Sequence, residues 1–459
     1  MPVSGVPLYD MIMGYTSMGR ASFYTPGHKG RAGFLTDIQS LVYDITELPD
    51  TASLYDGGDM IEQAERLAAD AFGASMTLFS AGGCTLCIHT MLMLGAGGGR
   101  VVFARNSHRS AVHAAALVGI DPVWAWPSGE NGQLEAEDIE QALKQPDIKA
   151  VYITSPDYYG NLADIKTISQ RCQKAGVPLL VDNAHGSHLG AFGLHPLSLG
   201  ADMTADSAHK TLPVLTGGAM LHIGRSGNDC GIDRRAAKSA MGVFGSTSPS
   251  FQVLASLDLA RDWWQRAGVQ AYRIKAEAVL ELAEAARHAG IGTAAGGQNR
   301  DPTRLTLDTS VIGIDGISAA AHFRDHGCEP EYADARYVVF IITPFNTPEE
   351  LGRLGDAIKK LPARQRRGYF LSKKENSNAY NYQYPNGLFP ERILSPREAL
   401  LAPSETVKAE RSVGRVAACA CCPCPPGIAA VVPGERISAE IAENLKISGY
   451  DRIIVVKNV

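Results

Sequence analysis

A lysine behind a strand-like run is the residue best suited to chemistry in this chain. The run Ala201–Asp206 leads within one turn to Lys210, and the earlier apolar run Leu179–Val181 ends in Asp182. The carboxyl ends of strands in an α/β sheet face the ligand crevice, so both side chains are expected there. A lone lysine would be a solvated surface residue. A lysine with a strand-end carboxylate is instead what pyridoxal phosphate requires: the amine holds the aldehyde, and the carboxylate keeps the pyridinium nitrogen protonated.

Two further patterns complete the groups that this cofactor needs. Segment 80–85 (Ser-Ala-Gly-Gly-Cys-Thr) follows a strand-like run and opens a helix, where free backbone N–H groups and the positive helix terminus bind a phosphate. His108 also follows a strand-like run and offers a flat ring for stacking. A glycine pair alone is weak evidence for a phosphate site. A lone histidine is more often a buried hydrogen-bonding residue than a ring stacker. Together they predict a phosphate cup and a ring stacker.

Apolar runs that alternate with helical stretches predict a parallel α/β domain that positions these groups. The expected strands are Met76–Ser80, Val101–Ala104, Ala150–Thr154, Pro178–Val181, Met203–Ala205 and Ala219–Ile223. A helix is expected from Asp59, with Glu62 completing a capping box, to just before Gly73. Two more helices are expected near 250–264 and 274–288, followed by a smaller α+β section.

Shifts in composition along the chain predict five segments. They are an N-terminal arm over 1–57, a large cofactor-binding domain over 58–255, a small α+β domain over 256–362, a connector over 363–394 and a C-terminal subdomain over 395–459. The connector is basic at Arg364–Arg367 and then rich in Asn, Tyr and Pro, which is typical of a surface segment.

The overall composition excludes several classes of function. The 459 residues include 43 Lys+Arg and 48 Asp+Glu, a formal charge of −5 that is too small and of the wrong sign for binding nucleic acid or an anionic membrane. Hydrophobic residues make up 45% and charged residues 20%, the profile of a globular chain. Neither a signal peptide nor a membrane span is expected, which favours the cytoplasm. The expected partner is a small molecule.

The nine cysteines predict reduced thiols rather than a disulfide framework. Four of them lie within 419–424, where prolines stiffen the chain and no histidine stands at zinc-finger spacing, so no metal site is expected. Cys84 and Cys87 form a CxxC pair, but the phosphate cup competes for the same residues and takes precedence over a redox role.

The order of these motifs resembles that of the fold type I pyridoxal-phosphate enzymes, and more narrowly the Orn/Lys/Arg decarboxylase family, the bacterial basic amino acid decarboxylases. The motifs that carry the resemblance cover nearly the whole chain and are specific only together: Thr25-Pro-Gly-His28-Lys29, Asp44-Ile-Thr-Glu47-Leu48, Asn106-Ser-His108-Arg-Ser, Pro156-Asp-Tyr-Tyr159-Gly160, Asp182-Asn-Ala-His185-Gly186, Ser207-Ala-His209-Lys210, Ser246-Thr-Ser-Pro249, Pro425-Pro-Gly427-Ile and Pro433-Gly-Glu435. The resemblance implies an aspartate aminotransferase-like large domain with a mainly parallel sheet and a smaller α+β C-terminal domain. The short chain is similar to the compact members, which have no N-terminal wing domain.

The resemblance also implies a role for each residue that matches a family motif. Lys210 is expected to carry the cofactor as the internal aldimine, Asp182 to pair with the pyridinium nitrogen, and His108 to stack on the ring. Ala184 is expected beneath the other ring face, where a larger side chain would not fit. His185 is expected to contact the ring oxygen or the substrate carboxylate.

The phosphate is expected to have a shell of its own. The residues that match it are Gly83, Cys84, Thr85, Ser207 and His209. Ser246 or Thr247 is expected to reach the phosphate from a neighbouring subunit. The resemblance therefore implies a homodimer with shared active sites.

Four positions depart from the family pattern. Cys84 keeps the backbone donor of the cup but removes a hydroxyl, and Asn183 stands where Glu is common. Asp157 adds a negative charge where Thr is usual, and Cys424 replaces an aromatic residue before Pro-Pro-Gly. These departures bear on the substrate rather than on the cofactor.

The reaction that the resemblance implies is decarboxylation of a basic L-amino acid, namely arginine, lysine or ornithine, to its amine and CO₂. The cofactor ring takes up the electrons that the carboxylate leaves at Cα. Lys210 or a histidine near it, His209 or His185, is expected to return a proton to Cα.

The identity of the substrate stays open at this point. Glu435, Asp44 and Glu47 are candidates to receive the distal cation of the substrate, beside their interpretation as surface or capping carboxylates. A transaminating or β-eliminating enzyme is an alternative, because the fold alone does not select which bond at Cα breaks. A non-catalytic binding protein that has kept the pocket is a further alternative.

Overall fold

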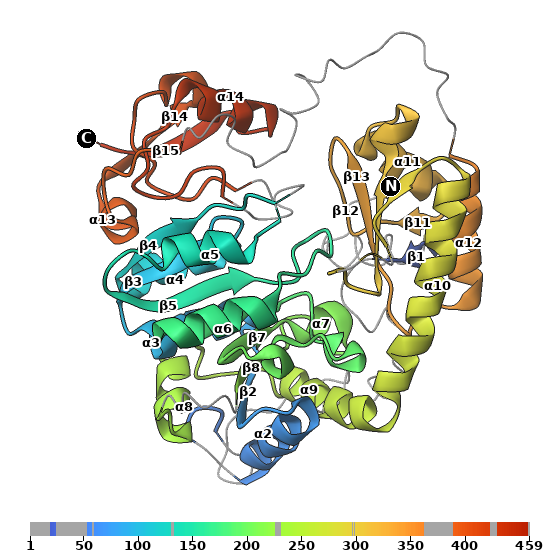
Figure 1. Cartoon of the computed structure of the whole chain (residues 1–459), viewed down its shortest axis with the longest axis horizontal. Helices are drawn as coiled ribbons and strands as arrows, with labels where there is room; N and C mark the ends of the chain where they lie inside the picture. Colours follow the sequence, from blue (N-terminus) through green and yellow to red (C-terminus); the bar gives the residue numbers. More distant parts are fainter. Residues whose placement is uncertain are drawn as a thin grey trace, which may run out of the picture.

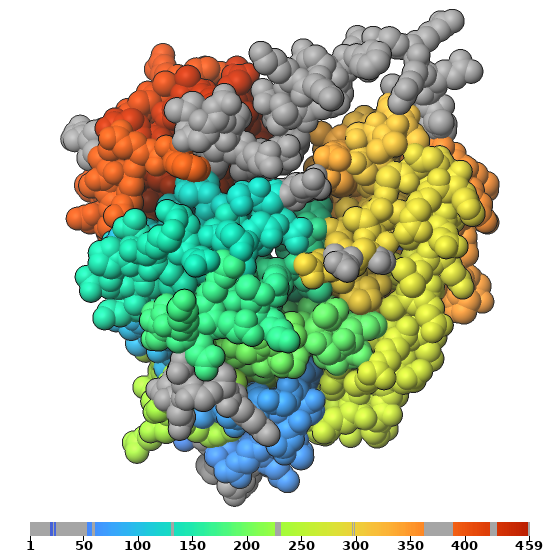
Figure 2. Space-filling model, in the orientation of Figure 1, coloured from blue at the N-terminus to red at the C-terminus, as the bar shows by residue number. Residues whose placement is uncertain are grey.

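The computed structural model describes residues 19–23, 53–56, 59–129, 133–224, 231–295, 297, 299–361, 389–422 and 429–457. These residues fall into a large α/β part, a small α+β part and a C-terminal part (Figure 1). The space-filling view in Figure 2 shows the small part, in yellow and orange, packed along one side of the large part, in green and teal. The C-terminal part, in red, lies beside the edge that carries β3 and β4 (Figure 1).

A seven-stranded sheet forms the centre of the large part. Its strands are β2 (Met76–Ser80), β3 (Gly99–Ala104), β4 (Ile120–Ala125), β5 (Ile148–Thr154), β6 (Leu179–Asp182), β7 (Met203–Asp206) and β8 (Ala219–Ile223). Their order is β2-β8-β7-β6-β5-β3-β4, and β8 alone runs antiparallel to its neighbours. Because β5, β6 and β7 are adjacent and parallel, their carboxyl ends meet at one edge of the sheet.

Helices cover both faces of this sheet, which explains why its strands are continuous apolar runs. Side chains alternate between the faces along each strand, so Val101 and Phe103 join one core cluster while Val102 and Ala104 join the other. The first layer is formed by α3 (Gly83–Ala96), α4 (Arg109–Val118) and α8 (Arg234–Gly242). The second layer is formed by α5 (Ala136–Ala142) and α6 (Ile165–Ala175).

A long helical connection leads from the large part to the small part. Helix α9 (Phe251–Trp263) packs beside α2 (Asp59–Phe72) and continues through a π-helical turn into α10 (Val269–His288). The small sheet has the order β12-β13-β10-β9. Its strands are β9 (Gly292–Thr293), β10 (Arg304–Asp308), β12 (Tyr332–Ala333) and β13 (Tyr337–Ile341), and its core includes α10, α11 (Gly316–Asp325) and α12 (Pro348–Lys359). Strand β1 (Ala21–Ser22) pairs in parallel with β11 (Cys328–Glu329).

The C-terminal part is a small α+β unit. It contains α13 (Pro396–Leu401), β14 (Ser404–Lys408), α14 (Ala439–Ile447) and β15 (Arg452–Val456). Strands β14 and β15 pair antiparallel, and α14 shares their core. Cys422 and Val432 of this part pack against Val112 of α4. Across the described ranges, no helix has the length and apolar character needed to cross a membrane.

A buried ion pair joins the C-terminal part to the large part. Glu435 Oε2 accepts a hydrogen bond from Arg105 Nη2 at 2.9 Å and another from the Val432 backbone N–H at 2.9 Å. The Arg105 guanidinium lies over the rings of Trp124 and Trp126, at 4.7 and 5.0 Å from their centroids. Glu435 is 1% exposed, so neither water nor salt screens the pair. The carboxylate considered for the distal cation of a substrate is therefore held by Arg105 of its own chain.

The six expected strands are confirmed, with small shifts at their ends. Strand β4 was not expected, because Asp121 and Pro122 interrupt its apolar pattern; Pro122 is tolerated because β4 is the edge strand beside β3. The helix expected from Ile274 begins earlier, at Val269, because the chain stays helical through Gly268. The five segment boundaries remain predictions.

The buried pair predicts how firmly the C-terminal part is attached. Glu435→Gln leaves the Arg105 cation buried without its counter-charge, so we expect the free energy of unfolding in urea to fall by about 3 kcal/mol. Glu391→Gln is the matched control, because Glu391 pairs with Arg436 at the surface, where the change is expected to be below about 1 kcal/mol. Equal unfolding midpoints for the two variants would contradict this role of Glu435.

Candidate active site

Lys210 lies in the short helix α7 (Ala208–Thr211), directly after β7. Its Nζ is 2.9 Å from Nε2 of His185, which follows β6. Burial lowers the pKa of Lys210, and the negative charge of Asp182 opposes this shift. The structure thus brings together the lysine, the aspartate and the histidine that the sequence placed at neighbouring strand ends.

Asp182 is the last residue of β6 and is 1% exposed. The Tyr152 hydroxyl donates to its Oδ2 at 3.2 Å, and the Ala184 backbone N–H donates to its Oδ1 at 3.1 Å. Burial raises the pKa of Asp182 to about 6, although the charge of Lys210 favours the carboxylate. The carboxylate is held in one orientation and would gain from a cation placed beside it.

The segment predicted to form a phosphate cup lies at the N-terminus of α3. Gly83 has φ +73°, a left-handed conformation that glycine adopts without strain, and its N–H donates to Gly217 O at 2.8 Å. A Cβ on Gly82 would lie 2.9 Å from the end of the Leu86 side chain, which would have to shift to make room for it. The amides of Cys84 and Thr85 follow at this helix terminus, where N–H groups have no partner within the helix. The backbone therefore fits an anion.

The side chains of the cup have different environments. Cys84 is 8% exposed, and burial followed by the charge of Asp182 raises the pKa of its thiol well above the ordinary value, so it stays protonated. Thr85 is exposed. Ser207 Oγ lies 3.3 Å from His209 Nδ1, and the His209 backbone N–H donates to Gly218 O at 3.1 Å. Bonds to Gly217 and Gly218 thus tie the glycine turn and the lysine turn to the same loop.

His108 is the N-cap residue of α4. Its Nδ1 accepts a hydrogen bond from the Ser110 backbone N–H at 3.2 Å, which fixes the direction of the ring. Burial, followed by repulsion from Lys210, lowers the pKa of His108 to about 4. The ring is therefore neutral at neutral pH. Ala184, beside Asp182, is buried with 9% exposure.

Ser246 and Thr247 are not brought together with the other predicted residues. Both are exposed and lie between α8 and α9, where Ser246 Oγ accepts a bond from the Ser248 backbone N–H at 3.2 Å. Their contact with a phosphate in a neighbouring subunit stays a prediction. The motif residues Asp44, Glu47 and Cys424 lie outside the described residues.

Arg304 is a residue of the site that the sequence reasoning missed. It begins β10 in the small part, is 2% exposed, and places Nη2 3.3 Å from His185 Nδ1. Its Nη1 donates to Tyr158 O at 3.3 Å, and the Tyr158 ring meets the His185 ring edge to face at 4.9 Å. A Cβ on Gly160 would lie 2.6 Å from the Arg304 side chain. Nothing local marks this arginine, because a strand from the other sheet brings it to the site.

The departure from the family pattern at Asp157 has a local structural explanation. Its Oδ1 accepts hydrogen bonds from the backbone N–H groups of Tyr159 and Asn161 at 2.9 and 2.8 Å, and its Oδ2 accepts one from Asn161 Nδ2 at 2.6 Å. Burial raises the pKa of Asp157, and these bonds favour the charged form. The carboxylate organises its own turn.

One buried group of potential metal ligands occurs among the described residues: His195, Asp206 and His222. The Leu197 backbone N–H donates to His195 Nδ1 at 3.4 Å, which leaves the ring proton on Nε2, 3.0 Å from Asp206 Oδ2. Asn183 Nδ2 donates to the same carboxylate oxygen at 2.9 Å. Donors of the chain thus compensate Asp206, and a protonated Nε2 does not bind a metal ion. Asn183, the second departure from the family pattern, is part of this network.

The strand order and the position of the lysine and aspartate define the class of protein: the fold is that of the fold type I pyridoxal-phosphate-dependent enzymes. The Francisella novicida lysine decarboxylase, a solved structure, matches 94% of this chain and 76% of its own with a TM-score of 0.71 and 19% identity. The chain belongs to the Orn/Lys/Arg decarboxylase family. Its residues 6–290 match the family's major domain and residues 379–448 match the C-terminal domain.

Two curated relatives are similar over nearly the whole chain. The arginine decarboxylase of Halalkalibacterium halodurans is 32% identical over 95% of this chain and 93% of its own length. The arginine decarboxylase of Bacillus subtilis is 29% identical over 95% of this chain and 91% of its own length. Family membership and fold class, both expected from the motifs, are confirmed.

The raised pKa of Asp182 predicts a stability that depends on pH. The folded chain binds this proton more tightly than the unfolded chain, so stability from this group is present below the ordinary pKa and is lost as pH rises through about 6. We expect Asp182→Asn to raise the free energy of unfolding of the cofactor-free protein at pH 8 by up to about 3 kcal/mol, and by less at pH 5. Urea unfolding at both pH values measures this. An equal effect at both values would exclude titration of Asp182 as the cause.

Proposed function

We propose that the protein is a pyridoxal-phosphate-dependent decarboxylase of basic L-amino acids, with arginine as its substrate. The observation that carries the proposal is the meeting of Lys210 and buried Asp182 at one sheet edge, beside a backbone anion cup, in a chain of this family. Arginine is chosen because the relatives that align over nearly the whole chain carry the name arginine decarboxylase.

The residues present fit the cofactor. Asp182 offers a buried carboxylate to a pyridinium nitrogen, and the neutral His108 offers a ring face near the same place. The α3 terminus and the Ser207 turn offer donors for a phosphate. When bound, pyridoxal phosphate supplies the electron sink that stabilises negative charge at Cα after the carboxylate leaves as CO₂.

The chain itself positions groups and moves protons in this reaction. Tyr152 and the Ala184 N–H hold the Asp182 carboxylate in one orientation, from which it would keep the ring nitrogen of a bound cofactor protonated. Lys210 and His185 form a hydrogen-bonded pair that is placed to deliver a proton to Cα. His185 is 4% exposed, and the low exposure strengthens its electrostatic contacts.

Glu331 is the carboxylate that we propose for the distal cation of the substrate. Its negative charge acts on Lys210, and the Tyr158 hydroxyl donates to its Oε1 at 2.7 Å. The Tyr158 ring also touches His185, so Glu331 belongs to the same side of the site. The carboxylate of Glu435, by contrast, is engaged by Arg105.

The reaction is tested by incubating the purified protein with arginine, lysine and ornithine and measuring amine, CO₂ and keto acid. We expect CO₂ and the matching amine from arginine. Lys210→Ala is expected to abolish both the visible absorbance of the bound cofactor and the release of CO₂, while Lys174→Ala, at an exposed lysine of α6, leaves both unchanged. Keto acid in place of CO₂ would support transamination, and cofactor absorbance that survives in Lys210→Ala would overturn the assignment of the lysine.

The role of Glu331 predicts a specific kinetic change. Glu331→Gln removes one charge from the pocket, so we expect KM for arginine to rise about tenfold, with a smaller change in kcat. Glu329→Gln is the control. Glu329 lies two positions before Glu331 in the chain and forms ion pairs with Arg20 and Arg324. An unchanged KM in Glu331→Gln would exclude Glu331 as the receptor of the distal cation.

A further inference from the structure

Three side chains form a hydrogen-bonded series that runs from the small part into the site. Arg304 Nη2 lies 3.3 Å from His185 Nδ1, and His185 Nε2 lies 2.9 Å from Lys210 Nζ. Arg304 and His185 are 2% and 4% exposed, so water does not compete for these ring nitrogens. The two ring nitrogens of His185 therefore contact two different groups, the Arg304 guanidinium at Nδ1 and the Lys210 amine at Nε2.

The chemistry of Arg304 determines which nitrogen of His185 carries a proton. A guanidinium offers only N–H donors and stays charged in proteins, so the nitrogen that faces it must present a lone pair. That nitrogen is Nδ1. Burial, together with the charge of Arg304, holds the pKa of His185 well below its ordinary value, so the ring is neutral and has one proton. The proton is therefore on Nε2.

The protonated Nε2 in turn determines the state of Lys210. A hydrogen bond at 2.9 Å needs one donor and one acceptor, and Nε2–H is already the donor. The Lys210 nitrogen must then accept, which an amine does and an ammonium does not. We propose that Arg304 is a positioning residue that fixes His185 in its Nε2–H form and thereby holds Lys210 as a free amine, ready to attach to the cofactor aldehyde. This inference rests on the proposed function.

The charged groups around Lys210 and His185 affect the protonation of both side chains. The negative charges of Asp182 and Glu331 favour the charged form of Lys210, whereas Arg304 disfavours it. His185 is faced by Lys210, Arg304, His108 and His209, all of which disfavour a charged imidazole. Burial is the main cause that lowers the pKa of Lys210, and a donor directed at the amine nitrogen acts in the same direction.

Packing alone does not explain the position of Arg304. Its Nε has no hydrogen-bond partner among the described residues, and its ion pair with Asp301 Oδ2, at 3.7 Å from Nη2, is too long for a hydrogen bond. Gly160 leaves the space that the Arg304 side chain needs. The guanidinium is therefore buried with incomplete compensation, and its contact with His185 is the one that reaches the reacting groups.

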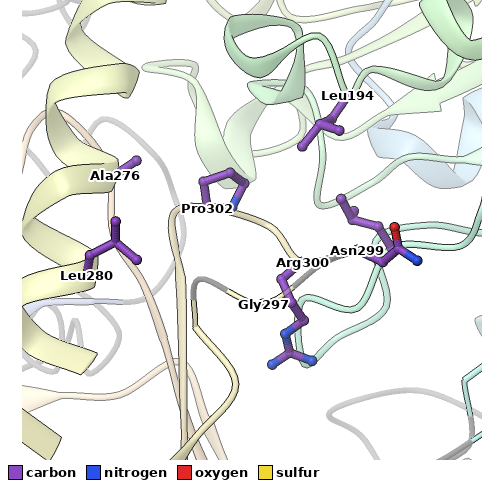
Figure 3. A pocket seen from close by; sticks show the side chains of 8 residues that line it. Leu194, Ala276, Leu280, Gly297, Asn299, Arg300 and Pro302 are labelled. Carbon is purple, nitrogen blue, oxygen red and sulfur yellow. The ribbon is translucent and has the colours of Figure 1, made fainter. Parts of the chain in front are cut away.

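Arg300 offers a matched control on the same segment. It donates to Tyr159 O at 3.3 Å and contacts Asn161, and it has no contact with His185. Figure 3 shows it at a separate pocket of about 290 Å³ that is also lined by Leu194, Ala276, Leu280 and Pro302. Arg300→Met therefore removes a cation close to Arg304 in the chain without changing the donor to the imidazole.

The first measurement is the tautomer of His185 in the full cofactor-free chain, from nitrogen chemical shifts of protein labelled with ¹⁵N-histidine. The signal is assigned as the one missing in His185→Gln. We expect protonated Nε2 and unprotonated Nδ1 in the wild type and in Arg300→Met. In Arg304→Met we expect the proton to move to Nδ1. A wild-type ring protonated at Nδ1, or an unchanged tautomer in Arg304→Met, would overturn the proposal.

The second measurement is the pKa of Lys210, from the pH dependence of its acetylation by trace acetic anhydride, read by mass spectrometry of its peptide. Arg304→Met is expected to raise this pKa by about one pH unit, which is a tenfold loss of free amine at a fixed pH below it. Arg304→Gln is expected to raise it as well, because the charge is lost and the shorter side chain ends two bonds before the position of Nη2. Equal values in all variants would overturn the proposal.

The two measurements use neither cofactor nor substrate, so they are independent of the proposed reaction. Far-UV circular dichroism identifies a variant that fails to fold; if Arg304→Met does, Arg304→Gln, which keeps a polar side chain at this position, carries the comparison. If CO₂ is released from arginine while the tautomer results fail, the inference falls and the proposed function stands. If no cofactor attaches to Lys210, the proposed function falls whatever the tautomer.

Discussion

Burial of charge at the carboxyl edge of the central sheet is the constraint on which the rest of the site depends. A buried ionised group is costly unless hydrogen bonds or an opposite charge compensate it. Asp182 receives bonds from Tyr152 and from the Ala184 N–H, and Asp206 receives them from Asn183 and His195. These bonds hold each carboxylate in one direction. The compensation of Asp182 is incomplete, which is why its pKa is raised and why a bound cation would stabilise it.

The same constraint explains how distant parts of the chain are tied to the site. Arg105 precedes the His108 turn and is held by Glu435 of the C-terminal part and by two tryptophan rings. On the opposite side, Arg304 of the small part reaches His185. Each arginine is buried, and each makes its contact across a boundary between parts. The site is therefore stable in this form only when the three parts are packed together.

Local patterns predicted much of the sheet and of the site. Strand-end positions placed Lys210, Asp182 and His108 correctly, because a continuous apolar run followed by a polar residue is readable without knowledge of the fold. The Gly-Gly turn before α3 was readable for the same reason. Strand β4 was missed because Pro122 breaks its pattern, and only its place at the sheet edge makes that residue acceptable. Ser246 and Thr247 are exposed in the single chain. Their contact with a phosphate in a neighbouring subunit therefore stays a prediction.

By itself the sequence determined the class of fold, the family, the strand-end positions of the lysine and the aspartate, and the glycine turn before α3, since each depends on neighbours within a few residues or on motif order. Tertiary structure alone decided what the charged residues do. It assigned Glu435 to Arg105, Asp157 to its own turn, and Arg304 to His185. The physical reason is that a side chain's protonation and partners depend on burial and on groups brought from other strands and domains. Spacing along the chain carries no information about either.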